Sequence, residues 1–453
     1  MTDSLRIIES RPGMSTLIVS AASAIAYIAL FRFIYEDFLV PVFGYSGFKM
    51  VTATEYETLL SNIIAFLPIL FFRGQKIPSD LIAVMMYVVV HVPTVITLQY
   101  AFKDYSDIIP YQVAFMLAHT LFFLVSWNAS GLRGFESHTD AVPMYTYYIL
   151  GVLVVGVLVA FFGSHLRFVS FADVYSLRGE NDKFMRGSSY IGYLMLWSSN
   201  FFAPLFIAYG CLQKRVWIVS MGVVCAVVTY MATGLKSAIL LPFAAMAIYF
   251  VTAHVRTIKY LFPLIVTFVL LSYLLTRHSD NKILFLAATV LFMRTIGVAG
   301  WLAAGYITVF NSYPFTYYSH IGIVNFFTGM YPFHNPVLGK AVWSIYQGRG
   351  GGHTNANANF LLTDGLAAMG IPGILLIAVV FYLLLLLINK VSAGHAPHFV
   401  FAMLTGAIVS FTNISLFTTL VSTGFVFCLL MLRFTRTSET PAAGEAGETP
   451  ADP

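Results

Sequence analysis

Charged side chains are scarce in this sequence. Asp, Glu, Lys and Arg together make up 10% of its 453 residues, whereas hydrophobic residues make up 58%. Soluble globular domains carry about 25% charged residues, so the composition excludes an ordinary soluble domain. Apolar runs recur along the whole chain, and each is long enough to cross about 30 Å of hydrocarbon as a helix. The sequence therefore predicts an all-α, polytopic helical membrane protein.

Cysteine pairs and nucleotide-binding motifs are also missing. Cys211, Cys225 and Cys428 lie in or beside apolar runs and show neither pairing nor metal-ligand spacing. The sequence has no Walker loop, no dinucleotide-binding glycine pattern and no basic-aromatic stripe. These absences argue against nucleotide hydrolysis by this chain and against a nucleic-acid partner.

About twelve membrane spans can be placed along the chain. Short connections rich in Lys and Arg are expected in the cytoplasm, and the basic connections here all fall on one side, which places both termini there. The first apolar run has no small-residue cleavage site, so it is expected to be retained as a span. The expected spans are 15–35, 56–72, 80–100, 110–128, 143–163, 189–210, 216–233, 237–253, 260–276, 371–389, 398–413 and 418–434.

One apolar stretch, 282–310, is left over. If it crossed the membrane, the basic C-terminal end would move outside, and Arg294 near its middle would be expensive in a lipid-exposed span. We expect it to be re-entrant or to lie at the outer interface, within a large external region from 277 to 370. The alternative is that a span upstream has been missed or wrongly placed. The chain is then a single membrane domain, 1–435, followed by a disordered cytoplasmic tail, 436–453.

Several cations depart from the charge rule because they fall in the expected external loops, 163–189 and 277–370, or in a tight external turn. A planar guanidinium donates two parallel hydrogen bonds to a phosphate, so such cations suit an anionic lipid head group, and a pyrophosphate above all. The alternative is pairing with nearby acids such as Asp173, Glu180, Asp182 and Asp280. The cations considered as pyrophosphate ligands are Arg178, Arg186, Lys236, Arg277 and Arg294.

Two segments carry a family resemblance. RTIGVAGWLAAGYITVFNSYPFTYYSHI, 294–321, is an arginine-led helix that runs to a tyrosine and a phenylalanine, then to a proline-containing stretch near a serine. NANANFLLTDGLAAMGIPGIL, 355–375, leads from asparagines through an acid to a glycine-rich start of the next span. Together with PSDLIAVMMYVVVHVP, DVYSLR and TGLKS, they resemble the O-antigen (oligosaccharide repeat unit) polymerases. Many such enzymes have Thr-Gly where this chain has Ala358-Asn359.

This resemblance implies a glycosyltransferase with GT-C-like architecture in the bacterial inner membrane, its active site facing the periplasm. Such an enzyme transfers a growing glycan from undecaprenyl pyrophosphate to a new lipid-linked repeat unit. A chain-length regulator and a repeat-unit flippase would be its protein partners. The outer side shows no Asp-x-Asp motif, so we expect a metal-independent enzyme without a cofactor.

The candidate site residues lie close to these motifs. His320, His334, His353 and Asp364 are candidates for the base, because imidazole titrates near neutral pH and Asp364 is the nearby acid. We favour His353, in a glycine-led loop, with Asp364 and Arg294 as further catalytic residues. A loop histidine exposed to water and a helix-capping aspartate are the alternative interpretations. The candidate glycan-binding residues are Tyr306, Tyr318, His320, Asn355, Asn357 and Asn359.

Two other functions stay open. An O-antigen ligase, which transfers polysaccharide to lipid A core, would use the same donor and a similar cationic cavity. A lipid-linked glycan transporter or flippase is the non-enzyme alternative. A transporter is expected to place paired charges near the bilayer midplane, whereas the cations here gather mostly at one end, which favours an enzyme.

Overall fold

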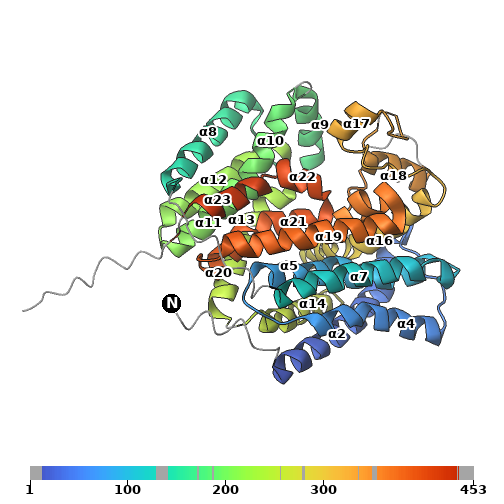
Figure 1. The fold of residues 1–453 in the computed structure, drawn as a ribbon. Coiled ribbons are helices and arrows are strands. Elements are labelled where there is room, and N and C mark those ends of the chain that lie inside the picture. Colours follow the sequence, from blue (N-terminus) through green and yellow to red (C-terminus); the bar gives the residue numbers. More distant parts are fainter. Residues whose placement is uncertain are drawn as a thin grey trace, which may run out of the picture. The chain divides into compact units, whose positions relative to one another are not determined.

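The computed structural model describes residues 13–128, 141–170, 173–185, 188–255, 257–277, 281–334, 336–348, 355–435 and 437 (Figure 1). Within these ranges the chain forms helices and no strands. Ten helical stretches of this described part are long and apolar enough to cross a membrane. The chain is therefore a polytopic helical membrane protein, as its composition predicts. Of the expected tail, 436–453, only Thr437 lies among the described residues.

The chain divides into two compact units. The first contains residues 1–133, 254–391 and 407–421, and the second contains 134–253, 392–406 and 422–453. The main helices of the first unit are α2 (Met14–Ile34), α4 (Glu55–Phe66), α5 (Pro78–Met86), α6 (Val92–Ala101), α7 (Ile109–Leu124), α14 (Leu261–Arg277), α15 (Lys282–Ala288), α16 (Val298–Phe310), α17 (Gly322–Thr328), α18 (Leu338–Gln347), α19 (Ala367–Ser392), α21 (Thr405–Asn413) and α22 (Leu416–Val421). Those of the second are α8 (Met144–Phe162), α9 (Val174–Phe184), α10 (Ser189–Trp197), α11 (Ala203–Leu212), α12 (Val216–Thr233), α13 (Lys236–His254), α20 (Pro397–Met403) and α23 (Phe425–Phe434).

Each unit packs around a central helix. In the first unit, the stretch Pro78–Ala101 is 94% buried over its most apolar window, and α4, α7 and α16 pack against it. This stretch includes a π-helical turn, η4 (Tyr87–His91), and its polar residues, such as His91 and Thr97, are buried with the apolar ones. In the second unit, α11 packs against α12 and α20.

The helical stretches differ from the expected spans at four places. Helix α4 and the following η3 (Leu67–Phe71) cover the expected span 56–72 but stay just below full spanning length, and the expected spans 398–413 and 418–434 are each divided into two short helices. Residues 282–310 form an unbroken helical stretch of 29 residues, in which π-helical η11 (Thr289–Gly297) joins α15 to α16. The expectation that this stretch is re-entrant or lies at the outer interface stays a prediction.

The polar stretch before the last long span forms a helical element of its own. The π-helical turn η12 (Leu361–Leu366) leads into α19, which is interrupted at Met369 and at Gly370, where φ is +68°. A glycine adopts this left-handed conformation without a steric penalty, and Pro372 then starts the apolar helix that the sequence predicts from 371. The short segment folds back on that helix, since a Cβ on Gly373 would lie 2.2 Å from the Gly365 carbonyl oxygen.

Replacing Gly373 by alanine should therefore destabilise the protein by about 1–3 kcal/mol. The added methyl group meets backbone atoms of Gly365, which cannot turn aside as a flexible side chain can. Gly156→Ala in α8 is the matched control, because a Cβ there has no atom within 4 Å. Thermal unfolding of the purified variants in detergent measures the difference. Equal midpoints for the two variants would contradict the close packing of η12 on α19.

Candidate functional site

Three separate parts of the first unit meet at the side chain of Asp364. Asp364 itself lies in η12, and its carboxylate is completely buried. His320 comes from the loop between α16 and α17, and Ser415 with Leu416 comes from the start of α22. These partners lie 44 to 52 positions from Asp364 in the sequence. The fold, and not local sequence, therefore creates this cluster.

The Asp364 carboxylate accepts three hydrogen bonds. Oδ1 accepts from the Ser415 hydroxyl at 2.8 Å and faces Nε2 of His320 at 3.0 Å, while Oδ2 accepts from the Leu416 N–H at 2.5 Å. An ionised carboxylate is an acceptor only, and a buried charge is tolerated only when it is paired and hydrogen-bonded. All three contacts suit the charged form. Asp364 is therefore placed to hold His320 and the start of α22, and its own oxygens are closed off from solvent.

Both ring nitrogens of His320 have partners. Nδ1 lies 2.9 Å from the Thr316 hydroxyl, which also lies 3.1 Å from the Ala367 carbonyl oxygen. The single hydroxyl proton can point to only one of these two acceptors. When His320 is neutral, Thr316 donates to Nδ1. When His320 carries a second proton, Nδ1–H donates to Thr316, whose proton turns to Ala367. The network can thus take up one proton on His320 without leaving a buried polar group unpaired.

The backbone beside His320 is strained. Tyr317 and Tyr318 have φ angles of +45° and +64°, a left-handed conformation that costs residues with a Cβ about 1–3 kcal/mol each. Hydrogen bonds from the N–H groups of Thr316 and Tyr317 to the carbonyl oxygens of Ala367 and Ala368 hold the loop in this shape. Strained non-glycine residues cluster at functional sites. The loop therefore marks this region as a candidate site independently of the charged pair.

The hydroxyl of Tyr318 lies within the electrostatic influence of Asp364. Burial raises the pKa of Tyr318, and the charge of Asp364 raises the pKa further. The ring of Tyr318 packs edge-on against Phe417, at 6.2 Å between ring centroids. Tyr318 is only partly buried, so its hydroxyl can act as a protonated hydrogen-bond donor beside the His320–Asp364 pair.

The asparagine-rich segment takes two roles. Asn355 and Asn357 are exposed, whereas Asn359 is buried, with its Oδ1 accepting from the N–H of Leu361 as a cap on η12. The Tyr306 hydroxyl donates to the carbonyl oxygen of Ala356 at 3.1 Å and holds the segment against α16. The exposed amides of Asn355 and Asn357 are free to meet sugar hydroxyls, while Tyr306 and Asn359 shape the segment.

The cations proposed as phosphate ligands have different surroundings. In the first unit, Arg277 at the end of α14 lies 3.7 Å from Asp37 as a half-exposed pair, and Arg294 in η11 is exposed without an ion pair among the described residues. In the second unit, Lys236 begins α13 and is partly buried, and Arg178 lies in α9. Arg167 in the same unit pairs with the exposed carboxylate of Glu180 at 2.5 Å. Among the candidates whose side chains the structure describes, Arg294 is therefore the one most accessible to an anion.

Two of the predicted site residues, Arg186 and His353, lie outside the described residues. The structure brings Tyr318, His320 and Asp364 together and adds two residues that sequence reasoning missed, Thr316 and Ser415. Ser415 has a local signal, since a serine directly before an apolar run is a common helix cap. Thr316 has none, because its contacts to His320 and Ala367 depend on the loop conformation.

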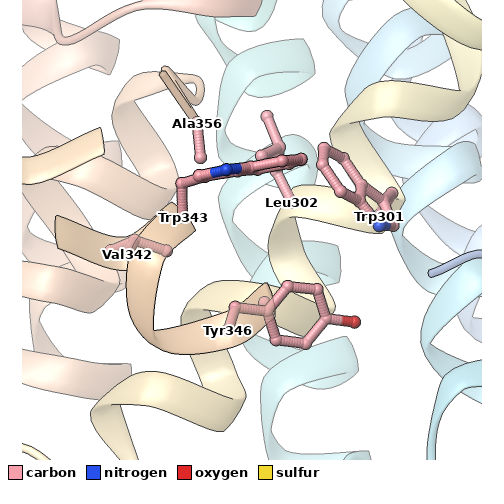
Figure 2. Close-up of a pocket in the computed structure, with 7 residues that line it drawn as sticks. Trp301, Leu302, Val342, Trp343, Tyr346 and Ala356 are labelled. Atoms are coloured by element: carbon pink, nitrogen blue, oxygen red, sulfur yellow. The ribbon is translucent and has the colours of Figure 1, made fainter. Parts of the chain in front are cut away.

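An aromatic pocket lies between α16 and α18 in the first unit (Figure 2). The indoles of Trp301 and Trp343 pack at 67° with ring centroids 5.6 Å apart, and Tyr346 lies beneath them. The cavity holds about 10 Å³, room for about one water molecule, and its walls are apolar. These rings therefore pack the two helices together, and the pocket is too small for a sugar.

Groups of three or more His, Cys, Asp or Glu residues that could hold a metal ion do not occur in the described part of the chain. Comparison of this chain with protein-family models, with curated protein sequences and with solved structures gave no match.

Proposed function

We propose that this chain is a membrane glycosyltransferase that joins lipid-linked oligosaccharide repeat units into a surface polysaccharide. The observation that carries the proposal is the Asp364–His320–Thr316 network, which is built to receive one proton. Transfer of a glycan to a sugar hydroxyl requires a base of this kind. The residues of the network lie in the two segments that resemble the O-antigen polymerases.

The contacts within the first unit support an external position for this network. Ser79 and Asn389 are hydrogen-bonded to each other at 2.8 and 3.0 Å, so the end of α19 lies beside the start of α5. The basic residues Arg73, Lys76 and Lys390 are close in sequence to this pair, which makes it the cytoplasmic end by the charge rule. The start of α19 then belongs to the opposite, periplasmic end, and so does η12, which contains Asp364 and leads into α19.

The helical stretch 282–310 fits an interfacial position in this topology. It follows Arg277, which pairs with Asp37 after the first span, and it ends at Asn311, whose side chain accepts a hydrogen bond from Tyr111 at the start of α7. Both Asp37 and Tyr111 lie on the external side of the expected spans. We therefore propose that about twelve other segments cross the membrane and that 277–370 forms the external region.

The reaction can be written with these groups. A hydroxyl of the acceptor sugar attacks the anomeric carbon of the donor glycan, and the bond to the undecaprenyl pyrophosphate oxygen breaks. The hydroxyl proton passes to the Thr316 hydroxyl, which gives its own proton to Nδ1 of His320, and the charge of Asp364 stabilises the resulting imidazolium. Arg277 and Arg294 neutralise the departing pyrophosphate, while Tyr318, Asn355 and Asn357 orient the glycans. The bilayer holds both lipid carriers beside the site.

Arg294→Lys should shorten the polymer although the charge is kept, because an ammonium cannot make the parallel hydrogen bonds of a guanidinium to a phosphate. Arg167→Lys is the matched control, since Arg167 is also an exposed arginine but already pairs with Glu180. Gel analysis of polysaccharide length from cells that carry each variant measures the effect. Normal ladders from Arg294→Lys would remove Arg294 from the list of phosphate ligands.

Polymerisation by the purified protein should persist in EDTA, because cationic side chains take the place of a divalent ion at the pyrophosphate. Product ladders with and without chelator provide the measurement. Complete loss of product in EDTA that magnesium or manganese restores would refute a metal-independent reaction.

A cell-based experiment separates polymerase from ligase. The chain is expressed in a strain that makes lipid-linked repeat units, lacks its own polymerase and has a lipid A core that cannot accept polysaccharide. A polymerase produces long glycans on the carrier lipid in this strain. A ligase produces no long glycans in this strain, and that result would contradict the polymerase and favour the ligase reaction.

A further inference from the structure

The loop that carries His320 belongs to a long segment without charge. From Thr295 to Gly339 the sequence contains no Asp, Glu, Lys or Arg, although only 295–310 of this range lies in a candidate span. Loops in water normally carry charged residues, and the surface of a soluble protein is about 25–35% charged. Residues 311–337 connect α16 to α18 and therefore have the composition of a segment that is not bathed in water on all sides.

Helix α17, within this connection, presents its apolar face outward. Ile323, Phe326 and Phe327 follow the i, i+3, i+4 spacing of one helix face, and they are 69%, 83% and 79% exposed. Met330, which follows the end of the helix, is 59% exposed. The polar Asn325 is turned inward, where its side chain accepts from the N–H of Tyr331 at 3.2 Å. In Figure 1, α17 lies beyond α18, away from the other helices of its unit. A surface helix of a soluble protein exposes its polar face, whereas α17 exposes its apolar face.

We propose that α17 inserts into the head-group region of the bilayer and anchors the His320 loop to the membrane surface. Interfacial helices bury apolar and aromatic side chains about 5–10 Å into the boundary between head groups and acyl chains. The connection follows the apolar helical stretch 282–310 directly, so a bilayer interface beside that stretch would be within reach of α17. A protein-docking patch usually has a polar rim, whereas the connection 311–337 has no Asp, Glu, Lys or Arg and includes the exposed aromatics Tyr313 and Tyr317.

The anchor has a consequence for the site. Gly322, the first residue of α17, is two residues after His320, so the depth of the helix in the lipid fixes the height of the histidine above the hydrocarbon. If the proposed function holds, this places the base at the level where a carrier lipid presents its pyrophosphate. The membrane contact itself rests only on the exposed face and the neutral sequence, and it stands whether or not the reaction is the one proposed.

The test uses the full-length chain in lipid nanodiscs. Cys211, Cys225 and Cys428 are replaced by alanine, and one cysteine is introduced at a time by Phe327→Cys or by Lys340→Cys and labelled with the fluorophore NBD. Lys340 is exposed and charged, so its label is the reference for water. Met330→Cys, at an exposed apolar residue just after α17, gives a second probe in case the Phe327 variant does not fold, and monodisperse elution is the check of folding.

The proposal predicts that the labels at 327 and 330 emit at shorter wavelength than the label at 340. Lipids with a doxyl group near the head group should remove most of their emission, while aqueous iodide should quench only the label at 340. Quenching of labels on α17 by iodide, with no effect of doxyl lipid, would overturn the proposal. Protection from both quenchers that appears only when a nanodisc holds two copies would also overturn it and would assign the face to a second copy of this chain.

Discussion

Asp364→Asn should slow glycan transfer by about 10²–10⁴-fold while the protein remains folded and inserted. The Leu416 N–H points at Oδ2, so the amide oxygen of asparagine should occupy that position and its NH₂ group should face His320. This NH₂ donates to Nε2 and moves the imidazole proton to Nδ1, the nitrogen that the proposed reaction needs as a base. The substitution also removes the charge that stabilises the imidazolium.

Transfer rates of purified variants, with a lipid-linked repeat unit as substrate, measure this effect. His320→Ala should cause a similar loss, and the double variant should be no worse than either single one, because the two residues act as a unit. His353→Ala belongs in the same experiment, since the sequence favours His353 as the base. A normal rate for Asp364→Asn together with products that stop at one repeat for His353→Ala would show that His353 is the base and that His320 is not.

Asp364→Ala should destabilise the protein by about 1–3 kcal/mol for each buried donor that it leaves without an acceptor. The change leaves Nε2 of His320, the Ser415 hydroxyl and the Leu416 N–H without their acceptor. Ser415→Ala is the milder control, because it removes one donor and leaves the carboxylate with two, at a cost of about 0.5–1.5 kcal/mol. Thermal unfolding in nanodiscs reports both changes.

A double substitution adds a further check of the same contact. His320→Ala combined with Asp364→Ala should be less destabilised than the sum of the two single variants, because their shared interaction can be lost only once. Additive effects, or an Asp364→Ala variant as stable as the unsubstituted chain, would show that the three hydrogen bonds do not hold η12, the His320 loop and α22 together.

Composition was sufficient to predict the class of fold, because apolar runs of spanning length must become helices in a bilayer. The interruptions were less visible. The break at Met369 and Gly370 has a local signal in the glycine and proline that follow each other closely, and the sequence did predict a helix start at 371. The division of 398–413 and of 418–434 into short helices depends on tertiary packing, which hydropathy does not report.

The candidate site could be predicted only in part. Tyr318, His320 and Asp364 were selected from the sequence, yet Asp364 and His320 come together across 44 residues through the folding-back of η12. The roles of Thr316 and Ser415 follow from hydrogen bonds that no spacing rule encodes. The exposed face of α17 was readable as an i, i+3, i+4 pattern, but whether such a face points inward or outward is decided by the fold alone.

The most direct measurement of the central claim is a reconstitution with pure components. The purified full-length chain in nanodiscs is given only an undecaprenyl-pyrophosphate-linked repeat unit, and the products are separated by size. The proposed function predicts a ladder of glycans that differ by one repeat, with release of undecaprenyl pyrophosphate, and no ladder from Asp364→Asn. A repeat unit that stays unpolymerised in the presence of folded, inserted protein would contradict it.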